Sequence, residues 1–360
     1  MQKIVLCGYY GMCDSQRNIV GHLGKVTKEY CELLKESFDI YLMASPCIYD
    51  KISEECKVKG KSLEYDVLVD EPFTLKKRVS DKVKIMKNIR QCVRDSDINT
   101  LFFYQVDFFF FLYIFLFYKK GRKRLFCLVY HQNFTGGIFE KYLNYIYQKA
   151  LLKIDGIVYT QKEQAIAHEN KLWLPDYLYD EDYYSRFDRK QKINKVVCLG
   201  TMNRYKQLEE LVNVFKNIDI PLEICGRFDD KERYRRLTEM KNDNITISDC
   251  ILSEEEYYRK LGESKYSVLP YDMQQYIART SGVLLESIYV GCIPIAPIML
   301  LEQNKIPGYK YDELHTLRNF NKSYMLQRSS VEEILQQNSK KMKEYELKSF
   351  FIEENIPRKS

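Results

Sequence analysis

Short apolar runs alternate with amphipathic stretches along the whole chain. In the first half these runs cover Ile4–Cys7, Phe38–Met43, Tyr65–Val69, Thr100–Tyr104, Leu125–Tyr130 and Gly156–Tyr159. In the second half they cover Lys195–Leu199, Pro221–Cys225, Asn244–Ile247, Tyr266–Leu269 and Ile293–Ala296. Short runs rich in Val, Ile, Tyr and Phe, separated by amphipathic segments, are typical of parallel strands that helices cover on both faces. Two sets of such strands predict an α/β fold with two doubly wound domains.

The chain divides between the two sets of runs. Its 360 residues leave room for two domains of about 150 to 200 residues each. The polar, charged stretch Tyr179–Asn194 lies between the sets and is the natural linker. We therefore expect a first domain over 1–185, a second over 186–335 and a helical tail over 336–360. The apolar face of the tail consists of Met342, Tyr345, Leu347, Phe350 and Phe351.

Composition narrows the class of protein. Hydrophobic residues make up 45% of the chain, which is enough for sizeable cores and excludes disorder as the main state. The formal net charge is +6 without a Lys/Arg stripe, so we expect no nucleic-acid partner. Eleven cysteines without a C-x-x-C pair, and an N-terminus without signal-peptide architecture, predict reduced thiols in the cytoplasm. Neither zinc-ligand spacing nor a P-loop motif occurs, so we expect no metal and no cofactor.

The segment Leu101–Tyr118 is almost continuously apolar and precedes the cations Lys119, Lys120, Arg122, Lys123 and Arg124. Gln105 and Asp107 interrupt it, and a bilayer span needs about 20 apolar residues. Three interpretations remain open at this point. The segment can be a buried strand followed by a helix, a surface that docks on a membrane together with the cations, or a true span.

Ligands of open parallel sheets bind beyond the carboxyl ends of the strands, and two loops there carry anion-binding features. Gly21 and Gly24 follow the first strand and precede a helix expected over 29–36, where backbone N–H groups can face a phosphate or simply form a turn. In the second half, Gly200 ends a strand, and Arg204 and Lys206 follow it. Two cations in a strand-to-helix loop suit a diphosphate, although a solvated loop is an equal alternative.

Further candidates follow the next strands of the second half. Gly226 ends a strand where a flat ring could approach the backbone, and Ser281 and Gly282 open a helix whose N–H groups can bind an anion. Glu286 lies one turn further and can accept bonds from ribose hydroxyls, the alternative being a solvated helix face. In the first half, His131 ends a strand and is either a site residue or a structural loop histidine.

The order of these motifs resembles the donor domain of GT-B glycosyltransferases, specifically the retaining family 4 group. The matching segments are Gly200 to Lys206, Leu222–Gly226, Val268–Pro270 and Ser281 to Ala296. In the first half, Gly21 to Thr27 is similar to the amino-terminal glycine loop of that group. Gly156–Thr160 with Leu172–Asp176 is similar to the strand–helix–strand segment that closes its acceptor domain.

The resemblance implies a GT-B fold, in which two Rossmann-like domains face a central cleft. It implies a nucleoside-diphosphate sugar in the second domain, with Arg204 and Lys206 at the leaving diphosphate and Glu286 at the ribose. His131 would lie near the transferred sugar. The family often has a second Glu eight residues before Glu286, and Ala278 stands there in this chain, so Arg279, Ser281 and Gly282 would hold the sugar instead.

Together with these residues, the resemblance implies a cytoplasmic, peripherally membrane-bound hexosyl-type glycosyltransferase of cell-surface polysaccharide biosynthesis. Its partners would be a nucleotide-sugar donor and a glycan or lipid-linked acceptor, with transfer under retention and without a metal. Two alternatives stay open. One is a catalytically silent GT-B protein that supports a partner transferase, which the missing carboxylate at Ala278 motivates. The other is a sugar-nucleotide epimerase.

Overall fold

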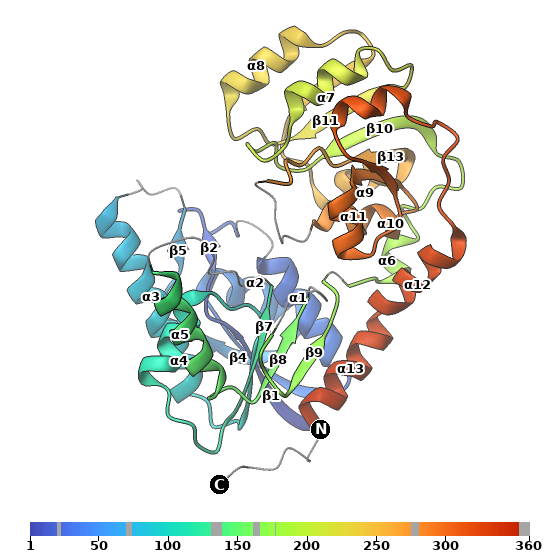
Figure 1. Ribbon diagram of the computed structural model, residues 1–360. Coiled ribbons are helices and arrows are strands. Elements are labelled where there is room, and N and C mark those ends of the chain that lie inside the picture. The colour runs from blue at the N-terminus through green and yellow to red at the C-terminus, as the bar shows by residue number, and fades with distance from the viewer. Residues whose placement is uncertain are drawn as a thin grey trace. The chain divides into compact units, whose positions relative to one another are not determined.

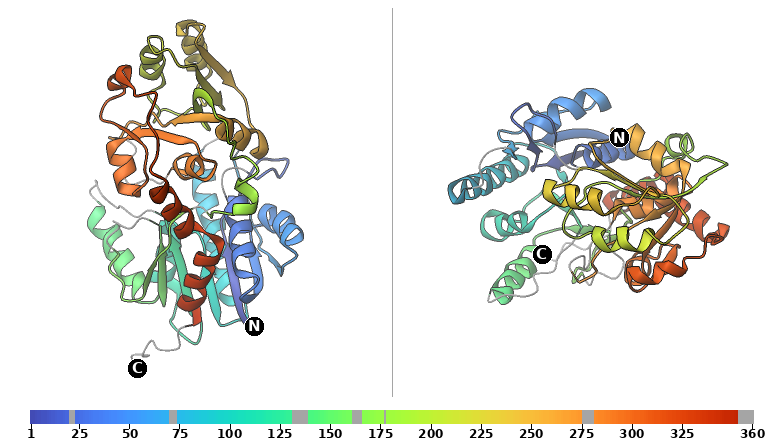
Figure 2. Two further views of the ribbon diagram at one scale, coloured as in Figure 1. Left: turned by 90° about the vertical axis from the view of Figure 1, so that its right-hand side faces the viewer. Right: turned by 90° about the horizontal axis from the view of Figure 1, so that it is seen from above.

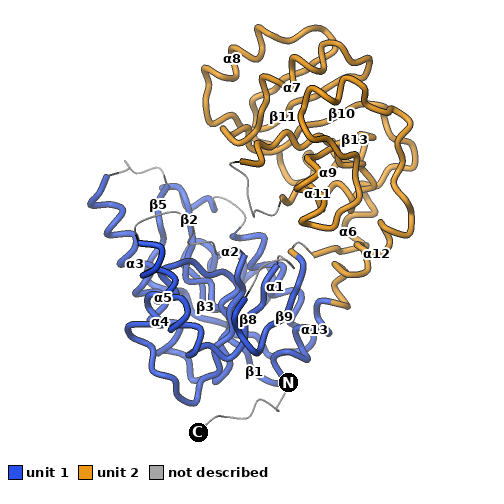
Figure 3. Tube along the Cα trace, in the orientation of Figure 1, with its two compact units in different colours: residues 1–175, 343–360 blue, residues 176–342 orange. Residues whose placement is uncertain are grey.

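A computed structural model describes residues 1–19, 23–69, 74–130, 139–160, 166–176, 178–274 and 281–352. The chain divides into two compact units (Figure 3). The first contains residues 1–175 and 343–360, and the second contains residues 176–342. Each unit is built on a parallel sheet with helices packed around it (Figure 1). The α/β fold with two Rossmann-like domains is confirmed.

The first unit contains a seven-stranded sheet in the order β4-β3-β1-β6-β7-β8-β9, with all neighbouring strands parallel. Its strands are β1 (Gln2–Gly8), β3 (Phe38–Ala44), β4 (Lys59–Ser62), β6 (Thr100–Phe103), β7 (Arg124–Val129), β8 (Gly156–Tyr159) and β9 (Lys171–Trp173). The prediction that residues 65–69 form a strand of this sheet is wrong. Only β5 (Val67–Leu68) forms there, and it pairs with β2 (Met12–Cys13) in a separate two-stranded sheet.

The edge strand β4 was not predicted because its sequence, Lys-Gly-Lys-Ser, carries no apolar signal. An edge strand needs few buried side chains, and lysine protects its free edge from further pairing. Gly60 is required for the pairing with β3, since a Cβ at this position would lie 1.9 Å from the carbonyl oxygen of Leu42.

The helices of the first unit cover the two faces of this sheet (Figure 1). They are α1 (Leu23–Leu34), α2 (Pro46–Cys56), α3 (Leu75–Arg94), α4 (Phe108–Phe117), α5 (Glu140–Leu151) and α13 (Lys340–Ile352). Side chains fix two of the helix starts: Thr74 Oγ1 accepts from the Lys77 amide at 3.1 Å, and Asp107 Oδ1 accepts from the Phe110 amide at 3.2 Å. Such N-caps satisfy amides that have no partner inside the helix.

The apolar segment 101–118 is a buried strand followed by a helix, the first of the three interpretations. Asp107, which interrupts the apolar run, caps the start of α4. Phe110, Phe111 and Ile114 of α4 are buried in the core of the unit, whereas the end of the helix turns outward. Among the described residues, no helix combines the length and the apolar character that crossing a membrane requires.

The carboxy-terminal helix α13 lies along the sheet of the first unit (Figure 2). The ring of Phe351 packs at centroid distances of 5.0 Å from both Phe102 and Phe126, and Phe350 packs at 5.5 Å from Phe126. Arg124 also donates to the Phe351 carbonyl at 2.8 Å. The tail expected at 336–360 thus belongs to the first unit from residue 343, and the unit boundary lies at 175/176 where 185/186 was expected.

The second unit contains a six-stranded parallel sheet in the order β12-β11-β10-β13-β14-β15. Its strands are β10 (Ile193–Leu199), β11 (Leu222–Gly226), β12 (Ile245–Asp249), β13 (Ser264–Val268), β14 (Ile293–Pro297) and β15 (Tyr309–Tyr311). Five match the predicted runs, and the short edge strand β15 was missed. The helices are α6 (Glu181–Tyr184), α7 (Leu208–Phe215), α8 (Lys231–Met240), α9 (Glu254–Glu263), α10 (Gly282–Tyr289), α11 (Ile298–Asn304), η1 (Leu314–Asn319) and α12 (Arg328–Asn338).

The strand order places the site of the second unit. From β10 the chain builds β11 and β12 on one side, and it then returns to build β13, β14 and β15 on the other. The carboxyl ends of β10 and β13 therefore form the topological switch point, where open α/β sheets bind their ligands. The first sheet has the same arrangement around β1 and β6.

Candidate functional site

Two glycines bring the ends of β10 and β11 together at the switch point. Gly200 follows β10 with φ +94°, and Gly226 ends β11 with φ +155°. A Cβ at Gly226 would lie 1.8 Å from the Gly200 carbonyl oxygen, so the two backbones approach more closely than any other residue allows. Both predicted glycines are thus needed to shape this edge of the sheet.

The loop from Gly200 to α7 is held against the segment that follows β13. The Gln207 amide donates to the Pro270 carbonyl at 2.7 Å, and the Asp272 amide donates to the Tyr205 carbonyl at 2.9 Å. Lys206 and Tyr271 form an antiparallel bridge between these two bonds. The loop therefore has a fixed position across the switch point.

Lys206 is buried at this point, with 4% of its surface exposed. Its Nζ donates to the Leu199 carbonyl at 2.8 Å and lies 3.8 Å from Met202 Sδ and 5.9 Å from the centroid of the Tyr271 ring. Burial lowers the pKa of Lys206, because removal from water disfavours the charged form. Among the described residues these contacts supply no negative charge, so an anionic ligand would stabilise the ammonium.

Arg204 has a different environment although it stands two residues away. Its side chain is exposed, its guanidinium lies 5.1 Å from the centroid of the Tyr205 ring, and it donates to Tyr205 Oη at 3.2 Å. This hydrogen bond raises the pKa of Arg204. The two cations predicted as a pair therefore differ: Lys206 is buried and held in place, whereas Arg204 is exposed and could move to contact a ligand.

The amino end of α10 adjoins the same segment. Ser281 is the N-cap residue and is buried, but its side chain makes no capping bond to the helix. Its Oγ lies 3.3 Å from Tyr271 Oη, and Gly282 begins the helix. Tyr271 thus contacts both Lys206 and Ser281, which joins the loop after β10 to the start of α10. The sequence analysis missed Tyr271, although it follows the Val268–Pro270 motif directly.

Glu286 is buried, with 7% of its surface exposed, so the alternative of a solvated helix face is wrong. Its two carboxylate oxygens accept hydrogen bonds from Tyr257 Oη at 2.7 Å and Tyr258 Oη at 2.8 Å. Burial and the neighbouring Glu286 charge raise the pKa of Tyr258. These two hydrogen bonds fix the orientation of the Glu286 carboxylate. No sequence signal identified the two tyrosines of α9.

Three predicted site residues, Gly21, His131 and Arg279, lie outside the described residues, as does Ala278. Gly24 is described and forms the second residue of α1, where a Cβ would meet the Ile19 side chain at 3.2 Å. The helix expected over 29–36 begins earlier, at Leu23, and ends at Leu34.

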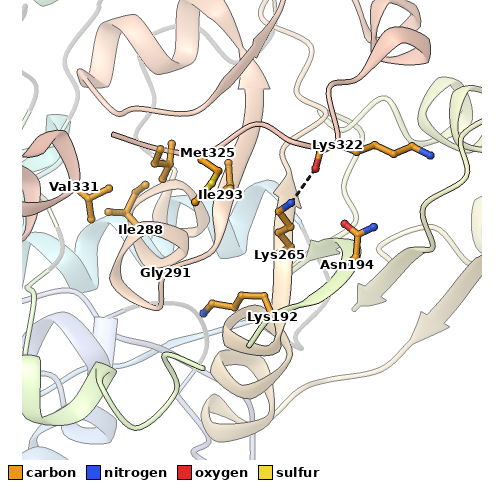
Figure 4. Close-up of a pocket in the computed structure, with 10 residues that line it drawn as sticks. Lys192, Asn194, Lys265, Ile288, Gly291, Ile293, Lys322, Met325 and Val331 are labelled. Carbon is orange, nitrogen blue, oxygen red and sulfur yellow. Dashed lines mark hydrogen bonds between the residues drawn. The ribbon is translucent and has the colours of Figure 1, made fainter. Parts of the chain in front are cut away.

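Two pockets of the second unit differ in their position on the sheet. A cavity of about 620 Å³ lies at the amino ends of β10, β13 and β14 and includes Lys192, Lys265 and Ile293 (Figure 4). Lys265 there already donates to the Lys322 carbonyl at 2.9 Å. This cavity lies on the edge of the sheet opposite the switch point, where doubly wound sheets do not place their nucleotide.

The second pocket, of about 370 Å³, lies at the carboxyl ends of β13, β14 and β15, beside Tyr271. Four acidic residues line it: Glu210, Asp272, Asp312 and Glu313. A diphosphate would be repelled there, so the surface formed by Lys206, Tyr271, Ser281 and Gly282 is the better anion site of this edge.

Solved structures share this architecture over almost the whole chain. The chain has the GT-B fold, the fold of glycosyltransferases with two Rossmann-like domains. It is similar to a glycosyltransferase from Rickettsia africae ESF-5, with a TM-score of 0.61, 10% identity and coverage of 98% of this chain and 99% of that chain. It is also similar to AviGT4, a glycosyltransferase involved in Avilamycin A biosynthesis, with a TM-score of 0.60, 12% identity and coverage of 97% of both chains.

A third similar structure belongs to a protein of another class, an epimerase. A putative UDP-N-acetylglucosamine 2-epimerase from Listeria monocytogenes matches with a TM-score of 0.54, 11% identity and coverage of 93% of this chain and 91% of that chain. No protein-family model and no curated protein sequence matches the chain. At these identities the matches establish the fold, and the activity has to be argued from the site.

Proposed function

We propose that the protein is a glycosyltransferase that moves a sugar from a nucleoside diphosphate to an acceptor hydroxyl, with retention as in family 4. The observation that carries this proposal is Lys206, a buried cation at the switch point whose described contacts include no anion. A buried charge is costly unless it is paired, so its retention at a ligand-binding edge favours an anionic ligand. The GT-B fold of the chain supports a nucleotide sugar as that ligand.

In the reaction, the bond between the anomeric carbon and the diphosphate oxygen breaks. The acceptor oxygen bonds to the same face of that carbon and passes its proton to the departing diphosphate oxygen. The barrier is the departure of the diphosphate as the sugar becomes oxocarbenium-like. Lys206 and Arg204 would neutralise the charge that grows on the leaving group, and the amides at Ser281 and Gly282 would face the phosphates. Fixed donors need no reorganisation during the reaction, which is the advantage of a preorganised site.

The other predicted residues take roles consistent with this chemistry. Glu286 would accept bonds from the ribose hydroxyls, while Tyr257 and Tyr258 hold its orientation. Gly200 and Gly226 would let the nucleotide approach the backbone at the ends of β10 and β11. In the first unit, Gly21, Gly24 and His131 would serve the sugar and the acceptor, and in the second unit Arg279 would contact the sugar.

A binding and turnover experiment tests the proposal. A thermal-shift screen of nucleoside-diphosphate sugars should raise the melting temperature of the protein with at least one base and sugar, because a ligand that binds only the folded state stabilises it. With that donor, the protein should release nucleoside diphosphate faster when an acceptor is added. A donor that binds but is converted to its epimer without an acceptor would favour the epimerase alternative, to which one similar solved structure also points. Binding without any turnover would favour the silent alternative.

We further propose that the acceptor is a glycan or a lipid-linked glycan of cell-surface polysaccharide biosynthesis, reached by peripheral contact with the cytoplasmic face of a membrane. Two apolar residues at the end of α4 support this, since Leu116 is 53% and Phe117 is 60% exposed. The exposed cations Lys119, Lys120 and Arg122 follow directly. Lys123 and Arg124, also expected to contact the membrane, instead bond to carbonyls of the first unit, Lys123 to those of Val93 and Ser96.

Vesicle flotation checks this membrane contact. Replacing Lys119, Lys120 and Arg122 with glutamine should lower partitioning onto anionic vesicles on the order of 100-fold, at about 1 kcal/mol for each cation near the surface. Added salt should weaken binding of the unmodified protein in the same assay. The matched control replaces three exposed cations of α8, Lys231, Arg235 and Arg236, and should bind as before. Equal recovery on neutral vesicles, or equal losses in both triple variants, would contradict the proposal.

A further inference from the structure

A second cluster of reactive side chains lies in the first unit and takes no part in the proposed transfer. Cys13, Cys47 and Asp66 come from three separate segments of the chain, and their Sγ and carboxylate oxygen atoms all lie within 4.8 Å of one another. Both thiols are buried, and Asp66 is partly buried. Within the described part of the chain, this is the one group of three His, Cys, Asp or Glu side chains with such spacing.

The fold assembles this cluster from local pairing. Cys13 lies on β2, and Asp66 directly precedes β5, the strand that pairs with β2. Cys47 is the second residue of α2, close to the carboxyl end of β3, where Pro46 begins the helix.

Two further contacts shape the cluster as a ligand set. The Cys47 amide donates to both carboxylate oxygens of Asp66, at 3.1 and 3.2 Å, which fixes the plane of the carboxylate. In metal sites, hydrogen bonds from surrounding groups to the ligating side chains orient those side chains toward the ion. Gly11 leaves the space, since a Cβ there would lie 1.8 Å from Ser45 Oγ and 3.1 Å from Cys47 Sγ.

We propose that Cys13, Cys47 and Asp66 bind a thiophilic divalent cation, Zn²⁺ by preference, with a fourth position for water or another ligand. Two thiolates and one carboxylate are a donor set that zinc accepts in tetrahedral geometry. Zn–S bonds of about 2.3 Å and Zn–O bonds of about 2.0 to 2.2 Å fit ligand atoms that are already this close. With three negative ligands the site would carry a net single negative charge, and Arg17, whose Nη2 lies 3.9 Å from Asp66 Oδ2, would offset it.

The ion would connect three segments of the first unit. It would link the β1–α1 connection through Cys13, the start of α2 through Cys47 and the β4–β5 connection through Asp66. All three lie near the carboxyl end of β3, so the metal would hold loops at the ligand-binding edge of the first sheet. Sequence spacing could not show this, because the ligands are separated by tens of residues and follow no short metal motif.

Cobalt titration of the full-length, reduced, metal-stripped protein tests the site. One equivalent of Co²⁺ should produce a thiolate-to-cobalt charge-transfer band, which Zn²⁺ should bleach. Cys13→Ser and, separately, Asp66→Asn should each weaken Co²⁺ binding. The serine variant should lose more than about 100-fold in affinity, which exceeds the loss expected for a residue that only hydrogen-bonds a metal ligand. Asp66→Asn keeps both thiols, so it remains informative if the serine variant fails to fold.

The matched control is the double variant Cys225→Ser/Cys250→Ser. It removes the thiol pair whose Sγ atoms lie 3.3 Å apart in the second unit and should leave the cobalt band unchanged. Absence of the band in the unmodified, fully reduced protein would overturn the proposal. So would a band that persists in both Cys13→Ser and Asp66→Asn, or one that disappears in the double variant.

Discussion

Replacing Lys206 with methionine is expected to lower turnover of the nucleotide sugar about 100-fold or more, the size of one lost preorganised electrostatic contact. Methionine fills a similar volume without the charge, and the lost bond to the Leu199 carbonyl is offset by relief of a buried ammonium. The free energy of unfolding should therefore change by no more than about 1 kcal/mol. Steady-state kinetics with the donor from the thermal-shift screen, together with denaturant unfolding, measure both quantities.

Lys192 provides a matched control in the same unit. It is largely buried and donates to the carbonyls of Gly262 and Val290, yet it lies at the amino edge of the sheet. Lys192→Met should lower stability and leave donor affinity unchanged. Near-normal turnover in Lys206→Met, or an equal loss of turnover in Lys192→Met, would refute the assignment of Lys206.

The pH dependence provides a second measurement on Lys206. Because burial lowers its pKa, the ammonium of the free protein loses its proton at a lower pH than an ordinary lysine. If the charged form is required, kcat/KM should fall as the pH rises through this lowered pKa. Lys206→Arg should move that fall to higher pH, since a guanidinium keeps its charge.

Gly226→Ala should destabilise the protein by about 2 to 4 kcal/mol, from backbone strain at positive φ together with overpacking. The added Cβ would lie 1.8 Å from the Gly200 carbonyl oxygen, which is backbone and can yield only if the end of β10 moves. Donor binding should weaken with it, because Lys206 is fixed to that end.

Gly121→Ala is the control for this substitution. A Cβ at Gly121 meets only the Lys119 carbonyl oxygen, at 3.9 Å, among the described atoms, so the change should be nearly neutral. Denaturant unfolding followed by circular dichroism compares the two variants. If Gly226→Ala is no less stable than Gly121→Ala, the close approach of the β10 and β11 ends is not a constraint.

The sequence predicted the central strands because burial on both faces makes them continuous apolar runs. The edge strands β4 and β15 were not predicted, because an edge strand needs little apolar surface. The β4 sequence, Lys-Gly-Lys-Ser, has none. The loop after β10 was identified from its cations. The different burial of Lys206 and Arg204 was not predictable, since it depends on the bridge to Tyr271, a contact between distant parts of the chain.

The partners of Glu286 and of the carboxy-terminal helix were hidden for the same reason. Tyr257 and Tyr258 stand on another helix, and an acidic-rich segment such as α9 gives no sign that two of its hydroxyls serve a carboxylate. Phe350 and Phe351 formed a visible apolar face, but nothing local indicated that it would pack against the first sheet. Long-range packing decides these features, and periodicity reports only local structure.

The position of α13 has a consequence for the order in which the chain folds during synthesis. A ribosome releases residues in chain order, so Phe350 and Phe351 emerge after the whole of the second unit, which is contiguous over 176–342. The second unit can therefore fold first. Until α13 has been synthesised, Phe102 and Phe126 of the first unit lack the rings that pack against them. Transiently exposed apolar surface of this kind is what chaperones bind and what aggregates. A nascent chain ending at Met342 would carry a finished second unit on an unfinished first one.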